Sequence, residues 1–319
     1  MSMMLNVSDT APASDEEKMS RIKMRESTTY WQDAYKRFMK NKVALFSFGI
    51  IVFLALFAFI GPYLSPYSNE QQVRGSERLF PCWEHPFGTD NLGRDLLVRT
   101  MVGTRISLAI GIFCSIIVLV IGTTVGAVSG YFGGWIDNLV MRVCEIIYSV
   151  PDILIIIILQ ISLKNFLDST FPNMSIGSAI FSIFVAFALI YWVSMARMVR
   201  GQMLALKERE YVLAAKAQGA SSGRIIRKHL LPNAVGTIIV TAMFQIPSAI
   251  FTESFLSFMG LGASAPLASL GSLANTALSG LSSYPYLMFF PALLIALIIF
   301  SFNNFGDGLR DALDPRMKE

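Results

Sequence analysis

The chain has 319 residues, of which 54% are hydrophobic and only 15% are charged, and its mean hydropathy is +0.55. So few charged side chains cannot cover a soluble globule of this size. The composition therefore excludes an ordinary pair of soluble domains and indicates that much of the exterior faces lipid. The net charge of +4 alone would suit nucleic-acid binding, but in a membrane protein its meaning depends on where the basic residues lie.

Six apolar segments are each long enough, or nearly so, to cross the hydrocarbon core of a bilayer as a helix. In chain order they are Val43–Ile60, Ile106–Val128, Ile146–Leu163, Ile176–Ala196, Ala234–Thr252 and Tyr286–Phe305. The third contains Pro151 and Asp152, which a membrane helix tolerates only if its neighbours satisfy the freed carbonyl and the carboxylate. The first lies too far from the N-terminus for a cleaved signal peptide. The sequence thus predicts an all-α, polytopic bundle of six transmembrane helices.

The basic residues divide unequally between the two sides of such a bundle. One side carries 20 of the 26 Lys and Arg residues, in residues 1–42, 130–145, 197–233 and 306–319. The positive-inside rule makes that side cytoplasmic, with both termini inside, although attraction to anionic lipid would by itself explain many of these charges. We expect cytoplasmic tails at 1–42 and 306–319, a first span at 43–60, an extracytoplasmic loop with an amphipathic helix at 61–105, and a five-helix transmembrane domain at 106–305.

The cytoplasmic loop 197–233 has the pattern of two short helices. Its first half is amphipathic, and Gly219 is suited to the left-handed conformation that ends a helix. Ser221 or Ser222 is suited to cap the second helix, and we expect Pro232 to end it. A plain linker does not need such structure, so the pattern favours a docking surface for a cytoplasmic partner.

Several motifs of this sequence resemble a known family. Ala214, Ala215, Gly219 and Leu231-Pro232 stand at the spacing of the EAA loop of ABC importer permeases. Five further motifs follow the pattern of the OppC/DppC permease subunits of peptide importers, in a resemblance that runs from about Tyr30 to Pro315. They are HPFGTDNLGRD at 85–95, GxRxSL at 103–108, GYFGG at 130–134, ESFLSFMGLG at 253–262 and GDGLRDALDP at 306–315.

The resemblance implies a type I ABC importer permease (MetI-like) fold in a prokaryotic cell membrane, forming half of a translocation pathway for oligopeptides. The implied partners are a homologous second permease, two cytoplasmic ATPase subunits, an extracytoplasmic peptide-binding protein and the peptide. The chain itself would be non-catalytic and bind no cofactor or metal, with ATP and magnesium on the ATPases, and would have no nucleic-acid partner. The resemblance also allows a dipeptide, nickel-chelate or glutathione permease of the same family as an alternative to an oligopeptide permease.

In the family, the EAA loop sits in a groove of the ATPase and transmits its closure to the membrane helices. Carried over to this sequence, the coupling residues are Tyr211, Ala214, Ala215, Gly219, Ala220, Leu231 and Pro232. The sequence departs from the motif where Leu213 replaces the Glu of the motif name. That departure puts in doubt any salt bridge made by the Glu.

The external motif at 85–95 contains Thr89, Asp90, Arg94 and Asp95, which the resemblance makes candidates for contact with the receptor protein. Equally, Thr89 or Asp90 would cap an amphipathic helix over Leu92–Met101. No Gly-Lys-Ser/Thr tripeptide occurs in the chain, so this glycine-rich segment does not read as a phosphate-binding loop.

Charged residues in or beside the spans are expected to face the protein interior or an interface. Arg142 is placed one helical turn before Glu145 and is expected to pair with it. Glu253, which follows Gln245 on the fifth span, has no basic partner nearby in sequence. Both are candidates for a pathway or partner-subunit contact, although a carboxylate at a helix end would also reach interfacial water.

Two other classes of protein are poorly supported by the sequence. A self-sufficient secondary transporter would be expected to show broken helices in a repeated layout, and the third span, which Pro151 interrupts, has no matching half. An enzyme would need convergent catalytic or metal-binding groups, but His85 and His229 fall on opposite sides of the membrane. The three cysteines are an odd number without paired spacing, which excludes a disulfide scaffold.

Overall fold

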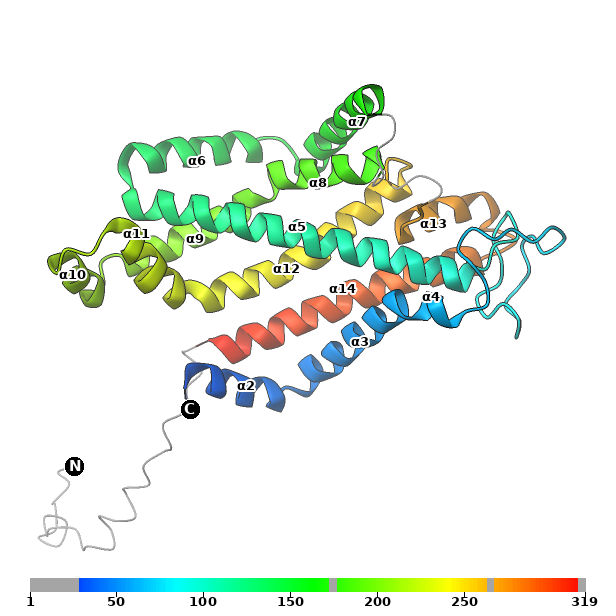
Figure 1. Cartoon of the computed structure of the whole chain (residues 1–319), viewed down its shortest axis with the longest axis horizontal. Helices are drawn as coiled ribbons and strands as arrows, with labels where there is room; N and C mark the ends of the chain where they lie inside the picture. The colour runs from blue at the N-terminus through cyan, green and yellow to red at the C-terminus, as the bar shows by residue number, and fades with distance from the viewer. Residues whose placement is uncertain (1–28, 172–176, 263–266, 315–319) are drawn as a thin grey trace, which may run out of the picture.

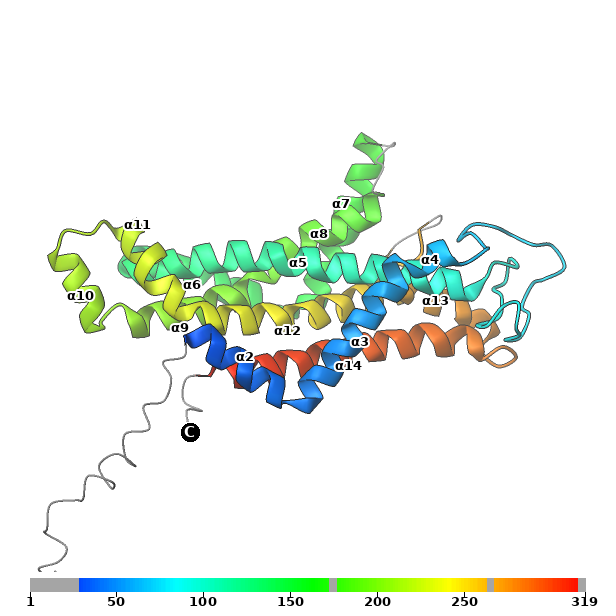
Figure 2. The same ribbon diagram turned by 60° about the horizontal axis from the view of Figure 1, so that its bottom comes forward.

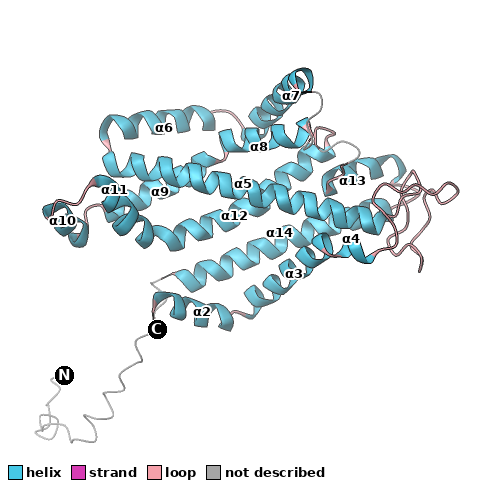
Figure 3. Ribbon diagram, viewed as in Figure 1, coloured by secondary structure: helices cyan, strands magenta, loops and turns pink. Residues whose placement is uncertain are grey.

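The computed structural model describes residues 29–171, 177–262 and 267–314, and within these ranges the regular secondary structure is helical (Figure 3). Six helical segments of these ranges are long and apolar enough to cross a membrane, which confirms the all-α, six-span prediction. Figure 1 shows these long helices packed side by side, with α10 and α11 at one end and the loop that precedes α5 at the other. We call these the loop end and the outer end of the bundle.

The helices follow in this order along the chain: α2 (Tyr30–Lys40), α3 (Lys42–Phe59), α4 (Gly61–Leu64), α5 (Leu96–Phe132), α6 (Gly134–Tyr148), α7 (Asp152–Thr170), α8 (Ser178–Ile190), α9 (Trp192–Leu206), α10 (Glu210–Ala217), α11 (Ser222–Ile225), the π-helical turn η2 (Ile226–Leu230), α12 (Leu231–Phe258), α13 (Leu270–Ala277), the short 3₁₀ helix η3 (Leu278–Gly280) and α14 (Tyr286–Leu313). The six spans are α3, α5, α7, α8 with α9, α11 to α12, and α14.

The second span differs from its predicted form. The expected separate helix Leu92–Met101 is wrong, because a single helix of 37 residues starts at Leu96 and runs to Phe132. Neither Thr89 nor Asp90 is its N-cap. Asp95 has that position, and its side chain accepts a hydrogen bond from the Val98 amide at 2.8 Å. An N-cap carboxylate satisfies an amide that the first helical turn leaves without a partner.

Two proline positions also differ from expectation. The third span begins after Pro151 rather than at Ile146, because the preceding residues belong to α6 and to a turn. Pro232 does not end the second loop helix. It lies in the first turn of α12, and the helical path continues from α11 through η2. The backbone amides of a first helical turn have no hydrogen-bond partner within the helix. A proline, which has no amide hydrogen, therefore costs no helical hydrogen bond there.

Close helix packing in the centre of the bundle depends on a stripe of glycines on α5. Gly122, Gly126 and Gly130 are spaced four residues apart and all face α9. A Cβ at Gly126 would lie 2.4 Å from the Ala196 carbonyl oxygen, and one at Gly122 would lie 2.5 Å from the Met195 Cβ. Small residues at this spacing allow two membrane helices to approach backbone to backbone. We call this contact the glycine seam.

Candidate functional site

The candidate site is the loop that the structure forms from residues 207–230 at the loop end of the bundle. Gly219 has a φ of 79° and ends α10, as predicted. The Gly219 amide bonds to the Lys216 carbonyl at 2.9 Å, and the Ala220 amide bonds to the Ala215 carbonyl at 3.0 Å. This pair of bonds is the pattern of a helix end closed by a left-handed glycine. The turn reverses the chain and sends it into α11.

The α10 helix has one face against the bundle and one face turned outward. Val212 is fully buried and Ala215 is 8% exposed, so both pack against this chain. Tyr211 is 40% exposed, Leu213 is 51% exposed, and Ala214 is also exposed. The two alanines of the motif therefore have different surroundings, which their adjacent positions in sequence do not reveal. Ala214 is available to a partner, and Ala215 holds α10 on its own bundle.

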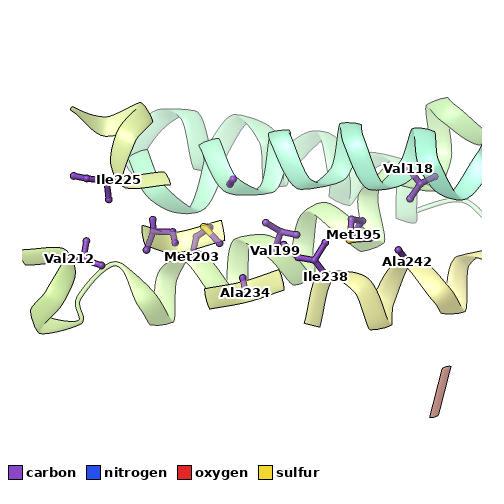
Figure 4. Close-up of a cluster of buried hydrophobic side chains, with 11 residues drawn as sticks. Val118, Met195, Val199, Met203, Val212, Ile225, Ala234, Ile238 and Ala242 are labelled. Carbon is purple, nitrogen blue, oxygen red and sulfur yellow. The ribbon is translucent and has the colours of Figure 1, made fainter. Parts of the chain in front are cut away.

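A cluster of buried apolar side chains joins this loop to three long helices (Figure 4). Val212 of α10 and Ile225 of α11 enter a core formed by α5, α9 and α12. The other members of the cluster are Val118, Ala127, Met195, Val199, Met203, Leu230, Ala234, Ile238 and Ala242. Because its side chains are packed into this buried apolar cluster, the loop is part of the bundle rather than a free linker. A displacement of α10 is therefore expected to move α9 and α12 with it.

An ion pair that sequence analysis missed reinforces the same end of the molecule. The Arg200 guanidinium of α9 donates two hydrogen bonds to the Asp137 carboxylate of α6, at 2.5 and 2.6 Å. Ser129 of α5 donates a third, at 2.5 Å. The hydrogen bonds from Arg200 are the main reason that the pKa of Asp137 lies below its ordinary value. Asp137 and Arg200 are 63 positions apart, so no local pattern links them.

The predicted coupling residues Leu231 and Pro232 lie apart from the exposed face of α10. They line an apolar groove of about 700 Å³ between α5 and the start of α12, with Trp31 of α2 and Arg227 of η2 also on its wall. Ala220 packs against the cluster of Figure 4. The structure thus divides the predicted coupling set into an outward-facing group, a group that anchors the loop and a group in the groove.

Of the two candidate residues of the fifth span, Glu253 is buried and Gln245 is partly exposed. Glu253 is fully buried, and its carboxylate accepts hydrogen bonds from Ser107 of α5 at 2.9 Å and Ser257 of α12 at 2.7 Å. Gln245 donates to the Ser194 hydroxyl at 2.8 Å. Hydroxyl donors satisfy the hydrogen-bonding needs of a carboxylate that is buried inside the chain. A contact of Glu253 with a pathway or a partner remains a prediction, and in this conformation its bonds connect α5 with α12.

The external motif forms a polar network at the outer end. The His85 ring lies 2.7 Å from the Asp95 carboxylate, and both side chains are buried. Asp90 pairs with Arg94 at 2.7 Å and lies 3.4 Å from Arg99. Thr89 is fully buried, and its carbonyl accepts a bond from the Tyr286 hydroxyl at 3.0 Å. These candidate receptor residues therefore fix the shape of the outer loop, and Arg94 is the one among the four predicted that is not classed as buried.

Two smaller predictions concern the charged side chains. The Arg142 and Glu145 pair is confirmed, with 2.9 Å between Nη1 and Oε2. His229 lies half-buried in η2, well separated in the fold from His85 at the outer end. Within the described ranges, no group of three or more His, Cys, Asp and Glu side chains is arranged to hold a metal ion.

In the part of the chain that the structure describes, six apolar helical segments pack together and a structured helical loop lies at one end, which is the architecture of a polytopic integral membrane protein. The chain belongs to the family of binding-protein-dependent transport system inner membrane components, whose model matches residues 122–319. Residues 29–81 match a second model, the N-terminal TM domain of oligopeptide transport permease C. The chain is thus a multi-pass membrane permease.

The relatives of this chain include named peptide permeases. The dipeptide permease DppC of Bacillus subtilis is 46% identical over 92% of this chain and 88% of its own length. The oligopeptide permease OppC of the same organism is 43% identical over 97% of this chain and 96% of its own. Two solved chains of the inward-facing MetNI methionine ABC transporter share the fold, with TM-scores of 0.54 and 0.52 at 22% and 24% identity. The alignments cover 96% of each of these solved chains, and 69% and 68% of this chain respectively.

Proposed function

We propose that this chain is one of two permease subunits of a peptide importer, and that the outward face of α10 docks onto a separate ATPase subunit. The observation that carries the proposal is the division of α10 into two faces. Val212 and Ala215 fasten it to the bundle, while Tyr211 and Ala214 stay exposed. A segment exposed on one side and packed into the long helices on the other is suited to pass on a push from a partner.

The transfer of motion follows the buried contacts. Closure of the ATPases on nucleotide would displace α10, and the cluster of Figure 4 would carry that displacement to α9 and α12. The glycine seam would then move α5 with α9, because backbones in direct contact cannot slide past each other without a clash. The bundle would shift between inward-open and outward-open arrangements as the ATPases favour one or the other.

The orientation proposed for the chain follows from charge. Among the described residues, the segments on the loop-end side of the six spans carry 14 of the 20 Lys and Arg residues, so this side would be cytoplasmic, with both termini inside. A peptide-binding protein would approach the outer end. There Thr89, Asp90 and Asp95 would act by holding the loop in shape, and Arg94 would be the residue available for contact. ATP and magnesium would bind on the ATPase chains.

Peptides are the proposed substrates. The match of residues 29–81 to the N-terminal domain of oligopeptide permease C supports oligopeptides. A dipeptide system is the second candidate, because DppC of Bacillus subtilis is 46% identical to this chain. Uptake of labelled dipeptides and longer peptides by cells that lack the chain, with and without its gene restored, would separate the two.

The docking face is tested by Ala214→Trp, with Ser169→Trp on the exposed surface of α7 as the matched control. We expect Ala214→Trp to weaken association with the ATPases on the order of tenfold or more, because a bulky side chain at a closely packed contact forces the two surfaces apart. The measurements are co-purification of the ATPase chains and peptide-stimulated ATP hydrolysis. Normal values of both for Ala214→Trp would contradict the docking assignment. Peptide uptake by the purified chain alone, driven by an ion gradient, would replace the permease proposal with a secondary transporter.

A further inference from the structure

The α2 helix lies within residues 1–42, for which the sequence predicts a cytoplasmic tail. Thr29 and Gln32 begin it with a capping box, in which each side chain bonds to the other residue's backbone amide. It ends at Lys40, and Asn41 starts α3 by accepting a bond from the Ala44 amide at 3.1 Å. Figure 2 shows α2 at an angle to α3, beside the end of α14.

One face of α2 is fixed to the bundle. The Tyr30 hydroxyl donates to the Leu313 carbonyl at 2.9 Å, and Arg37 donates to the Asp314 carbonyl at 3.0 Å. Ala34 is buried, and the Phe38 ring packs edge-on to Phe305 at 5.5 Å. Contacts at both ends and in the middle hold the helix in one rotational setting. The directions of its remaining side chains are therefore defined.

The second face of α2 is apolar and exposed. Trp31, Tyr35 and Met39 are 54%, 63% and 47% exposed, and their spacing of four residues puts them in one stripe. The stripe continues onto the first span, where Val43 and Phe46 are 59% and 67% exposed. The first span is an apolar helix of a membrane permease, so its exposed apolar side chains are suited to face lipid, and the stripe on α2 extends that apolar surface.

The third face of α2 is basic. Lys36 and Lys40 are exposed one turn apart, and Lys42 is exposed at the start of α3. The one acidic residue of the helix, Asp33, is bonded to Arg37 at 2.6 Å, so it does not offset the lysines. An apolar stripe beside a row of lysines is the arrangement of helices that lie in the plane of the membrane interface.

We propose that α2 lies in the interface of the cytoplasmic leaflet, with Trp31, Tyr35 and Met39 at the acyl boundary and Lys36 and Lys40 bound to anionic phospholipid headgroups. The assignment to the cytoplasmic leaflet rests on the orientation given under the proposed function, whereas the contact with lipid does not. Aromatic rings and lysines are the side chains that anchor a helix at this depth. The helix thereby fixes the depth of the first span and of the end of α14, to which it is bonded.

Spin labels at neighbouring positions test the depth of the stripe. Cys114 and Cys144 are buried, so Cys82→Ser removes the exposed thiol. Tyr35→Cys and Lys36→Cys are then labelled in the full-length chain, within the assembly it forms, in nanodiscs that contain phosphatidylglycerol. We expect the label at 35 to collide more with oxygen than with a water-soluble nickel chelate, and the label at 36 to show the reverse.

Two results at position 35 would overturn the proposal. A label as accessible to the nickel chelate as the one at position 36 would mean that the stripe faces water. A label shielded from both reagents would mean that another protein covers the stripe. An impermeant thiol reagent that modifies Lys36→Cys from outside intact cells would contradict the orientation in the proposed function but not the contact with lipid.

Lipid selectivity tests the lysines. We expect wild-type chain to retain spin-labelled phosphatidylglycerol in preference to phosphatidylcholine, and Lys36→Gln/Lys40→Gln to lower that preference by about fivefold for each lysine removed. Lys164→Gln on α7, which is not part of the row of lysines on α2, is the matched control and is expected to leave the preference unchanged. An unchanged preference in the double variant would overturn the role of the lysines. Failure of the coupling test on Ala214 has no bearing on either measurement, because neither needs ATP.

Discussion

The two ends of the bundle are held together by different chemistry. At the loop end, α5, α9 and α12 meet through the glycine seam and an apolar cluster, with the bonds among Asp137, Arg200 and Ser129 beside them. At the outer end, the loop before α5 is fixed by polar bonds around Asp90 and Asp95. Apolar packing is non-directional, and a packed group of helices moves as one body, whereas a hydrogen-bond network must break bonds to rearrange. We therefore expect the loop end to transmit motion and the outer end to resist it.

The largest effect is expected from Gly126→Leu in the glycine seam. Even a Cβ at this position would lie 2.4 Å from a backbone oxygen of α9, so α5 and α9 must separate to admit the side chain. Overpacking of this kind costs about 3 kcal/mol or more. We expect loss of most of the folded chain, measured by thermal unfolding and gel filtration in detergent.

Gly49→Leu is the matched control for the seam. No atom lies within 4 Å of a Cβ at Gly49 of α3, and this glycine is exposed on the outside of the bundle. The same change of residue should leave the unfolding temperature of this variant close to that of the wild type. Equal losses in the two variants would show that a leucine in an apolar helix, rather than the seam, is responsible.

A smaller effect is expected from Asp137→Asn at the loop end. The side chains of Asp137 and Arg200 are 12% and 31% exposed, so removing the carboxylate should cost about 2 kcal/mol, less than for a fully buried pair. Arg200 lowers the pKa of Asp137, which means that the pair stabilises the fold at pH values above the ordinary aspartate value of about 4. The difference in stability between wild type and Asp137→Asn should therefore persist at neutral pH, begin to shrink as pH falls below that value, and vanish once the pH is below the lowered pKa of Asp137 in the folded chain. A difference that is constant with pH would contradict the ion pair.

The sequence predicted those features that local patterns encode. Apolar length gave the six spans, and Gly219 was identified as a helix end because glycine tolerates positive φ. The capping box of Thr29 and Gln32 would have revealed α2, and the four-residue spacing of Gly122 and Gly126 would have indicated a close helix contact.

Other features depend on distant parts of the chain. Asp137 meets Arg200 only because α6 and α9 fold against the same end of α5, and Glu253 meets Ser107 across 146 positions. A proline is compatible both with the end of one helix and with the first turn of the next. The sequence around Pro232 does not distinguish these two positions, and only the path of α12 shows that Pro232 lies in a first turn. Pairings of this kind are set by tertiary packing, which one sequence does not display.

The smallest effect is expected at the outer end, from Asp95→Ala compared with Asp95→Asn. Alanine loses the cap on the Val98 amide and leaves the buried His85 ring without its carboxylate partner, at a cost of about 1.5 kcal/mol. Asparagine keeps an oxygen that can cap the helix, so it should recover about 1 kcal/mol of that loss. Thermal unfolding of the three proteins provides the comparison. If alanine and asparagine destabilise equally, the His85 bond rather than the cap holds the start of α5, and the outer end would then be fixed by one buried pair instead of a network.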